Sequence, residues 1–314
     1  MKNAKIPRRS FLLGLAACSA AGILTACKGD DTPASSASTS PEAPASSVSE
    51  LEPIGLFTVE DFPKLDGSTA CIPLMAQMMA DTTGIDLEVA QSSISVSTTA
   101  YAWENFGLYP DEEYTARMLV VYEAPDYVKE ELKEANAQLE QKPIGRDALV
   151  FIVNENNPVK SLTRQQLKDI YAGKITNWKE LGGTDAPITL YTREDGSGTR
   201  EVFVERALNK GSIVQSANVV NSNGAMKTSV AQDKQSIGYV GIGHVDKNVK
   251  ALVFDKMVPS QENASNGTYK VTRLLFMNTK GAPEGITKAF IDYIYTPEGT
   301  EIIKKSGYIP TGRQ

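Results

Sequence analysis

The chain has 314 residues, of which 32 are basic and 38 are acidic, so its formal net charge is −6. An acidic chain without clusters of Lys and Arg does not fit nucleic-acid binding, which depends on such clusters. Three Cys and a single His, His244, are too few for a credible zinc site. We therefore expect no nucleic-acid partner, no cofactor and no metal.

The first 26 residues have the pattern of an export signal. Lys2, Lys5, Arg8 and Arg9 form a basic start, and the stretch 11–26 is apolar or small and uncharged. It is too short to span a membrane comfortably and matches the apolar region of a signal peptide. Loss of residues 1–26 removes four basic and no acidic residues, which leaves a net charge of about −10.

A lipid anchor is indicated where this signal ends. Leu24-Thr25-Ala26-Cys27 resembles a bacterial lipobox, in which the cysteine is lipidated and becomes the first mature residue. Residues 27–50 would then form the lipidated Cys27 and a disordered tether, because Ser, Ala, Pro and Thr dominate them. A plain secretory signal with a chance cysteine is the alternative, and Arg8-Arg9 leaves twin-arginine or general export open.

From residue 51 onward, short apolar runs alternate with amphipathic stretches, which predicts an α/β fold with mostly parallel strands. The predicted strands are 118–122, 148–153, 188–191, 237–240 and 274–277. The predicted helices are 74–81, 124–139, 164–171, 199–208 and 287–295. A last helix begins with Thr296 as N-cap and Pro297 in its first turn, and ends near Gly307.

Two breaks in this pattern predict two lobes. The segment 154–158 is polar and rich in turn-forming residues, and 241–243 contains two glycines. If the chain crosses between lobes at both breaks, residues 51–153 and 244–314 form lobe 1 and residues 154–243 form lobe 2. A cleft would then lie between lobes joined by two hinge strands.

The segment 191–200 has the pattern of an anion-binding loop. It contains Arg193 and Gly196-Ser197-Gly198-Thr199 between a predicted strand and a predicted helix. Glycines let the backbone approach a ligand, and the helix start supplies hydroxyls and N–H groups. Arg193 can donate two parallel hydrogen bonds to an oxyanion. Taken alone, the segment fits an ordinary Gly-Ser turn with a capping hydroxyl equally well.

Two further segments repeat this pattern of hydroxyls before a helix. Ser68 and Thr69 precede Pro73 and an apolar helix, and Thr98 and Thr99 follow two serines. Serine and threonine are common N-caps, so each segment is weak evidence by itself. The three segments together predict one site for a small anion.

These residues resemble the phosphate-binding proteins of bacterial phosphate ABC transporters, in the type II periplasmic-binding-protein superfamily. The loop 193–199 is similar to the family's Arg-x-x-Gly-Ser-Gly-Thr phosphate loop. Further matches are the run 162–178, which ends in Lys-Ile-Thr-Asn-Trp178, and the segments 237–241, 295–299 and 307–310. The resemblance covers essentially the whole chain and implies a two-lobed α/β fold with a ligand cleft.

Carried over by position, the resemblance implies a set of phosphate contacts. Lobe 1 would supply Ser68, Thr69 and Thr98 or Thr99, and lobe 2 would supply Arg193, Ser197, Gly198 and Thr199. The family also places an acid beside the ligand, and Glu123 in Tyr122-Glu123-Ala124-Pro125 stands where the best-known members have Asp. A solvated acid at a helix start is the alternative for Glu123.

The acid would provide selectivity. Phosphate keeps a proton at neutral pH and can donate it to a buried carboxylate, whereas sulfate would leave that carboxylate unpaired. Leaving a buried charge unpaired discriminates by about two to three decades in affinity.

The sequence therefore predicts a monomeric, lipid-anchored binding protein on the extracytoplasmic face of the cell membrane. It would deliver inorganic phosphate to the membrane permease of an ABC importer. The alternatives are a binding protein for sulfate or molybdate and a surface lipoprotein that uses the fold for sensing. An enzyme such as a phosphatase is not expected, because the sequence shows no Ser-His-Asp arrangement, no paired metal ligands and no cysteine nucleophile motif.

Overall fold

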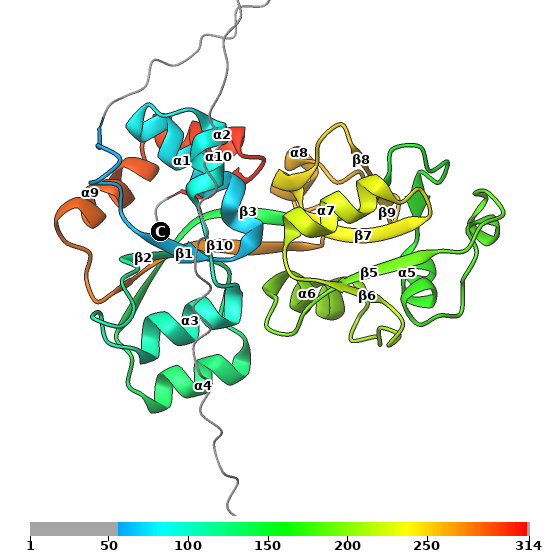
Figure 1. The fold of residues 1–314 in the computed structure, drawn as a ribbon, viewed down its shortest axis with the longest axis horizontal. Helices are drawn as coiled ribbons and strands as arrows, with labels where there is room; N and C mark the ends of the chain where they lie inside the picture. The colour runs from blue at the N-terminus through cyan, green and yellow to red at the C-terminus, as the bar shows by residue number, and fades with distance from the viewer. Residues whose placement is uncertain (1–55, 313–314) are drawn as a thin grey trace, which may run out of the picture. The chain divides into compact units, whose positions relative to one another are not determined.

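The computed structural model describes residues 56–312 (Figure 1). The expected signal 1–26, Cys27 and the whole tether region to residue 50 lie outside the described residues. Within residues 56–312, no helix combines the length and the apolar character that crossing a membrane requires.

Strands and helices alternate along the described chain. The strands are β1 Leu65–Gly67, β2 Met118–Val121, β3 Leu139–Asn154, β4 Ser161–Leu162, β5 Thr189–Arg193, β6 Asn218–Val220, β7 Ser236–Gly241, β8 Val249–Ala251, β9 Val253–Phe254, β10 Thr272–Lys280 and β11 Ile309–Pro310. The α-helices are α1 Ile72–Thr83, α2 Leu87–Ser93, α3 Thr99–Leu108, α4 Asp126–Glu134, α5 Arg164–Tyr171, α6 Gly198–Val202, α7 Asn223–Gln232, α8 Gln261–Ser265, α9 Gly285–Ile294 and α10 Pro297–Lys305. Short 3₁₀ turns are η1 Thr69–Cys71, η2 Trp178–Leu181 and η4 Ile242–His244, and η3 Phe203–Ala207 is a π-helical continuation of α6.

Most predicted elements are confirmed where local signals are strong. Helix α5 has the predicted bounds because Thr163 and Gln166 form a reciprocal capping box. Thr296 caps α10 as predicted, and Gly307 follows the helix with a φ of 88°. Helix α4 is shorter than predicted, since Asn136 adopts a φ of 51° and β3 begins at Leu139.

The principal sheet is mixed, so the prediction of mostly parallel strands is wrong. Its order is β1-β2-β10-β3-β7-β5-β6. β1 pairs with β2, and β5 with β6 and β7, in parallel, but β10 and β3 pair antiparallel with each other and with their other neighbours. The long strands β3 and β10 lie side by side in the middle of the sheet (Figure 1).

We call β1 and β2 with the helices that pack on them the first half of the structure. Alternate residues of β2 face opposite sides, as in any strand. Met118 and Val120 join a cluster with α1, α9 and α10, whereas Leu119 and Val121 join a cluster with α3 and α4. The first half thus has helices on both faces of its strands.

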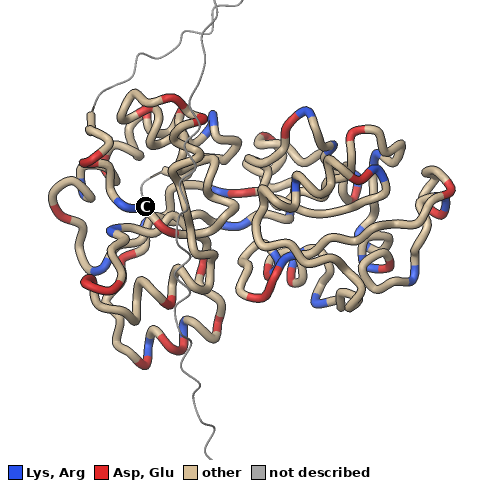
Figure 2. Tube along the Cα trace, viewed as in Figure 1, with Lys and Arg blue, Asp and Glu red and all other residues tan. Residues whose placement is uncertain are grey.

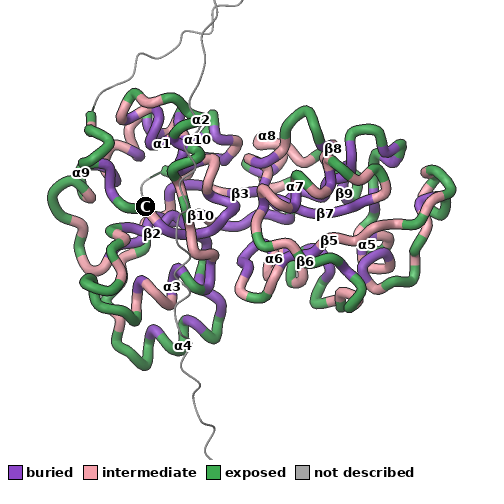
Figure 3. Tube along the Cα trace, in the orientation of Figure 1, coloured by how far each residue is buried: buried purple, intermediate pink, exposed green. Residues whose placement is uncertain are grey.

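The second half is built on β5, β6 and β7 around one further cluster. Residues 148–153 of β3 are all buried in it, together with Leu167 of α5, Phe203 of η3 and Met226 of α7. The central strands are accordingly buried, while exposed residues lie on outer helices and loops (Figure 3). A strand that is covered on both faces is apolar at every position, as residues 148–153 are.

The change from one half to the other falls inside strands. On β3, Ile144 packs in the first half and Ala148 in the second; near β10, Val271 packs in the second half and Leu275 in the first. Ala148 of β3 pairs with Thr272 of β10 where the core changes. The predicted crossings 154–158 and 241–243 begin at the last residues of β3 and β7, and the division into lobes stays a prediction.

Candidate anion-binding site

Four helical segments from the two halves begin near the junction between them. Ser68 is the N-cap of η1, which leads into α1; Thr98 precedes α3, Ser197 precedes α6 and Ser222 precedes α7. The three serine hydroxyls accept amide hydrogens of their first turns, whereas Thr98 makes no capping bond. First-turn N–H groups lack partners within a helix and carry partial positive charge.

Asn223, the first residue of α7, joins two of these helix starts. Its Nδ2 donates to Thr69 Oγ1 and to Thr199 Oγ1, both at 3.2 Å, and its Oδ1 accepts from the Gly241 amide at 3.2 Å. Thr69, Thr199 and Asn223 are all buried. Thr69 of the first half and Thr199 of the second therefore share one hydrogen-bonded network.

Arg193 ends β5 beside this network and is only 2% exposed. Its Nε and Nη2 donate to the two carboxylate oxygens of Glu194 at 2.8 and 2.6 Å, and Nη2 also lies 3.4 Å from the Asn221 carbonyl. Nη1 is buried and has no hydrogen-bond partner. The two nitrogens expected to donate to an anion, Nε and Nη2, thus donate to Glu194. Nη1 is the remaining nitrogen without a hydrogen-bond partner.

A second buried arginine, Arg273 on β10, reaches the same network. Its Nη2 donates to Thr199 Oγ1 at 3.3 Å, and Nε and Nη2 donate to Asp147 Oδ2 at 3.2 and 3.0 Å. The guanidinium carbon lies 3.2 Å from the centre of the Tyr122 ring, whose hydroxyl donates to Asp147 at 2.8 Å. As in Arg193, Nη1 is buried without a partner.

The starts of α3 and α6 touch directly. The Ala100 amide donates to the Gly196 carbonyl at 3.2 Å. A Cβ added to Gly198 would lie 2.5 Å from Thr99 Oγ1, so only glycine fits there. The Oγ1 atoms of Thr98 and Thr99 are both buried and lack hydrogen-bond partners.

The chemistry of the unpartnered atoms favours an anion. Guanidinium nitrogens can only donate hydrogen bonds, and threonine hydroxyls can donate as well as accept. Leaving such groups buried and unpaired costs about 1–3 kcal/mol each. Hydrogen-bond acceptors of an anion are the partners that the donors of Thr98, Thr99, Arg193 and Arg273 lack.

Glu123 departs from the expectation of a buried acid. Its side chain is 62% exposed, and Oε2 lies 3.6 Å from Lys129 Nζ. It lines a cavity of about 130 Å³ between the halves that Gly198 and Arg273 also line. Three further acids, Asp126, Glu201 and Glu205, line the same cavity. The structure therefore places Glu123 beside the candidate site, in contact with solvent.

His244 and Cys71 are buried side chains whose surroundings indicate a structural role. His244 Nε2 lies 3.2 Å from the carbonyls of Thr69 and Ala70, and burial lowers the pKa of its imidazole to about 4. The ring is neutral at pH 7 and links η4 to η1. Burial raises the pKa of the Cys71 thiol to about 12, so it is no nucleophile at neutral pH. Residues 56–312 contain no cluster of acids, His and Cys that could hold a metal.

Asn223 and Arg273 were missed by reasoning from the sequence. Arg273 is a single charged residue inside the apolar run 271–277, and Asp147 precedes the apolar run 148–153 in the same way. Asn223 follows the N-cap Ser222 and a short strand. A charge inside a strand buried on both faces is a signal that could have singled out Arg273 and Asp147.

Comparison with known proteins identifies the class of protein. The PBP superfamily domain matches residues 67–298, so the chain belongs to the PBP superfamily. The phosphate-binding protein PstS of Bacillus subtilis is 38% identical over 160 residues, which are 50% of this chain and 53% of that protein. The chain thus spans about half the length of this curated relative.

Solved structures cover more of the chain. A structure from Clostridium perfringens, named for a phosphate ABC transporter substrate-binding protein with bound phosphate, is 32% identical with a TM-score of 0.66; the match covers 79% of this chain and 99% of that one. An ABC-type phosphate transport receptor from Vibrio cholerae is 30% identical with a TM-score of 0.56 and the same coverage. These matches confirm the fold and the resemblance to phosphate-binding proteins of ABC transporters, a family of transport proteins and not of enzymes.

Substitution of Gly198 tests whether the two helix starts must touch. Gly198→Ala places a Cβ 2.5 Å from Thr99 Oγ1 and should hold the halves apart, at a cost of about 1–3 kcal/mol, or roughly 5-fold to 160-fold in anion affinity. Calorimetric titration with phosphate measures this loss. The control is Gly224→Ala on α7, whose added Cβ meets only Ser222 Oγ at 3.8 Å. If both variants bind phosphate with equal affinity, binding does not require the starts of α3 and α6 to touch.

Proposed function

We propose that this protein binds inorganic phosphate at the junction of its two halves and delivers it to the membrane permease of an ABC importer. The observation that carries the proposal is that buried donors in both halves lack hydrogen-bond partners within residues 56–312. Thr98 and Thr99 on one side and Arg193 and Arg273 on the other have polar atoms without partners. Relatives named for phosphate binding, at 32% and 30% identity over nearly their whole length, support the same ligand.

Binding of phosphate by this chain would depend on nearby hydrogen-bond donors and not on the net charge of the protein. The chain is acidic, and acidic and basic residues are interspersed along the described trace (Figure 2). The net charge of the chain therefore does not attract phosphate. Buried N–H groups and guanidinium nitrogens act at short range in a medium of low dielectric constant, where each interaction is stronger than in water.

We further propose that the two halves are lobes that close on phosphate. β3 and β10 would be the hinge strands, because the hydrophobic core changes from one half to the other along them. On this basis lobe 2 would extend from about residue 148 to about residue 271. Hydrogen bonds from Asn223 to Thr69 and from Ala100 to Gly196 would then belong to the closed state.

Residues outside the described range complete the proposal. Cleavage before Cys27 and lipidation of this cysteine would anchor the monomer to the extracytoplasmic face of the cell membrane. Residues 28–50 would give the binding domain reach toward its permease. The lipobox pattern Leu24-Thr25-Ala26-Cys27 supports this step.

Calorimetry with phosphate, sulfate and arsenate tests the function and the role of Arg193. The wild-type protein should bind phosphate, and Arg193→Gln should weaken binding by about 2–5 kcal/mol, roughly 30-fold to several thousand-fold, because Glu194 also loses its partner. Lys174→Gln removes the same charge from an exposed ion pair and should leave the affinity unchanged. Absence of phosphate binding by the wild type would refute the proposal, and a preference for sulfate would favour the other oxyanions.

Glu123→Gln tests whether this acid accepts the proton of phosphate. We propose that it does so, since it lines one cavity with Gly198 and Arg273. The phosphate-over-sulfate preference should then narrow by about tenfold or more. Asp185→Asn is the control, because Asp185 forms an exposed ion pair with Lys179 and does not line this cavity. Unchanged selectivity in Glu123→Gln would remove Glu123 from the site.

Cys27→Ser tests the anchor. In bacterial cells the wild-type protein should fractionate with membranes and incorporate a labelled fatty acid, whereas Cys27→Ser should lose the label. Cys18→Ser, within the expected signal, is the control and should retain it. A wild-type protein without label would show that Cys27 is not lipidated.

A further inference from the structure

Thr98 has a backbone conformation that threonine rarely adopts. Its φ is 126° and its ψ is 168°, in a region occupied almost entirely by glycine. The residue precedes α3, its amide donates to the Gly67 carbonyl at 3.2 Å, and its Oγ1 is buried without a partner. A strained residue of this kind persists only where its surroundings impose the conformation.

The carboxylate of Asp66 holds the residue immediately before Thr98. Asp66 is 5% exposed, and its Oδ1 accepts from the amides of Gly67 and Ser97, both at 2.6 Å. Its Oδ2 accepts from Ser97 Oγ at 2.6 Å and from the Tyr114 hydroxyl. Ser97 thus makes two hydrogen bonds to one buried carboxylate, which fixes its backbone and its side chain together.

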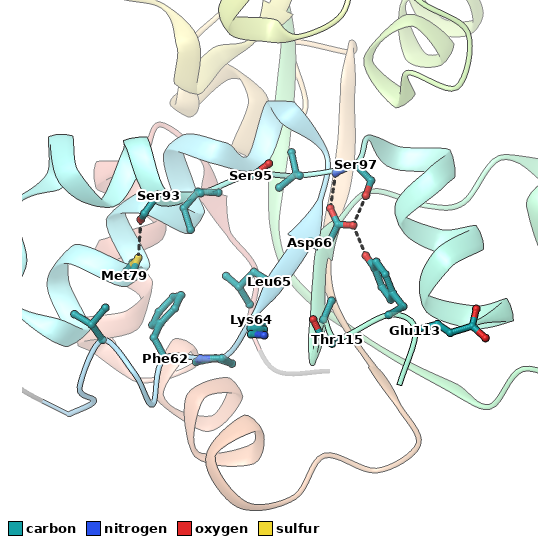
Figure 4. A pocket seen from close by; sticks show the side chains of 16 residues that line it. Phe62, Lys64, Leu65, Asp66, Met79, Ser93, Ser95, Ser97, Glu113 and Thr115 are labelled. Atoms are coloured by element: carbon teal, nitrogen blue, oxygen red, sulfur yellow. Dashed lines mark hydrogen bonds between the residues drawn. The ribbon is translucent and has the colours of Figure 1, made fainter. Parts of the chain in front are cut away.

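Packing holds this segment on one side only, where Ile94 and Val96 lie against the core of the first half. Behind Asp66 lies a cavity of about 580 Å³, which Ser95, Ser97 and Tyr114 also line. Figure 4 shows Ser95 and Ser97 following one another along its edge, with Asp66 facing Ser97. Ser93 and Ser95 are exposed, so this side of the segment offers little contact to hold Thr98 in a strained conformation.

The alternative is that Asp66 only stabilises the fold. Its hydrogen bonds do not separate the two roles, because Tyr114 belongs to the fold while Ser97 leads into the site. Gly67 also links Asp66 to Thr98, since its carbonyl accepts the Thr98 amide, but only Ser97 is bonded to Thr98 in the chain. A positioning role therefore requires that loss of the Ser97 bonds affects ligand affinity and that loss of the Tyr114 bond does not.

We propose that Asp66 is a positioning residue for anion binding. By fixing Ser97 it holds Thr98 in the strained conformation in which the Thr98 and Thr99 hydroxyls and the start of α3 face the anion. Asp66 does not touch the ligand. The inference rests on the proposed function, since it assumes that phosphate contacts this helix start.

A double-mutant cycle between Asp66 and Thr98 tests the proposal by phosphate calorimetry and thermal unfolding. Asp66→Asn should weaken phosphate binding by about tenfold or more, because Thr98 can relax. Thr98→Gly loses a hydroxyl but adopts the same backbone without strain, so adding Asp66→Asn in that background should change affinity less than about twofold. Equal losses in both backgrounds would overturn the proposal. So would a lower unfolding temperature with unchanged affinity.

Two milder variants keep the test decisive if Asp66→Asn does not fold. Ser97→Ala removes only the bond to Oδ2 and should weaken binding by about threefold to tenfold. Tyr114→Phe removes another bond to the same oxygen without touching Ser97 and should leave affinity unchanged. The reverse order would overturn the proposal. If the proposed function is wrong, neither the wild type nor any variant binds phosphate. If only the role of Asp66 is wrong, the wild type still binds phosphate.

Discussion

Burial of two arginines at the junction of the halves is the constraint on which the site depends. Taking a guanidinium out of water is costly unless it is paired and hydrogen-bonded. Arg193 is paired with Glu194 and Arg273 with Asp147, and each pairing leaves Nη1 without a partner. The charges are thus compensated well enough to remain buried, while one nitrogen of each guanidinium has no hydrogen-bond partner.

The same constraint connects the site to the strands that link the halves. Asp147 lies on β3 and Arg273 on β10, and these two residues are paired in the antiparallel register. Asp147 also accepts from the Ile242 amide at 3.3 Å, and Arg273 donates to Thr199. Hydrogen bonds therefore run from Thr199, at the start of α6, to the point at which the hydrophobic core changes. A movement between the halves would alter the site and these bonds together.

The two halves contribute different kinds of donor. The second half supplies Arg193 and the glycine-rich start of α6, where backbone groups can come close because Gly198 has no side chain. The first half supplies hydroxyls, of which Thr98 is held at a strained φ. Strain concentrates where binding groups must be held in place before the ligand arrives, since prior ordering reduces the cost of binding.

Much of the fold could be predicted from the sequence because its signals are local. The capping box at Thr163, the N-cap Thr296, and the apolar run of β3 depend on neighbours within a few residues. The loop with Arg193 and Gly198 could be found for the same reason. These features report hydrogen bonds and side-chain alternation that the chain makes with itself over short distances.

Only the tertiary structure decided which distant groups meet. Arg273 and Asp147 are 126 positions apart in the chain, and Asn223 and Thr69 are 154 apart. No local pattern encodes such pairings, nor the exposure of Glu123 or the positions at which the core changes along β3 and β10. These depend on how the strands register and on what packs over them, because burial is a property of the assembled chain and not of a segment.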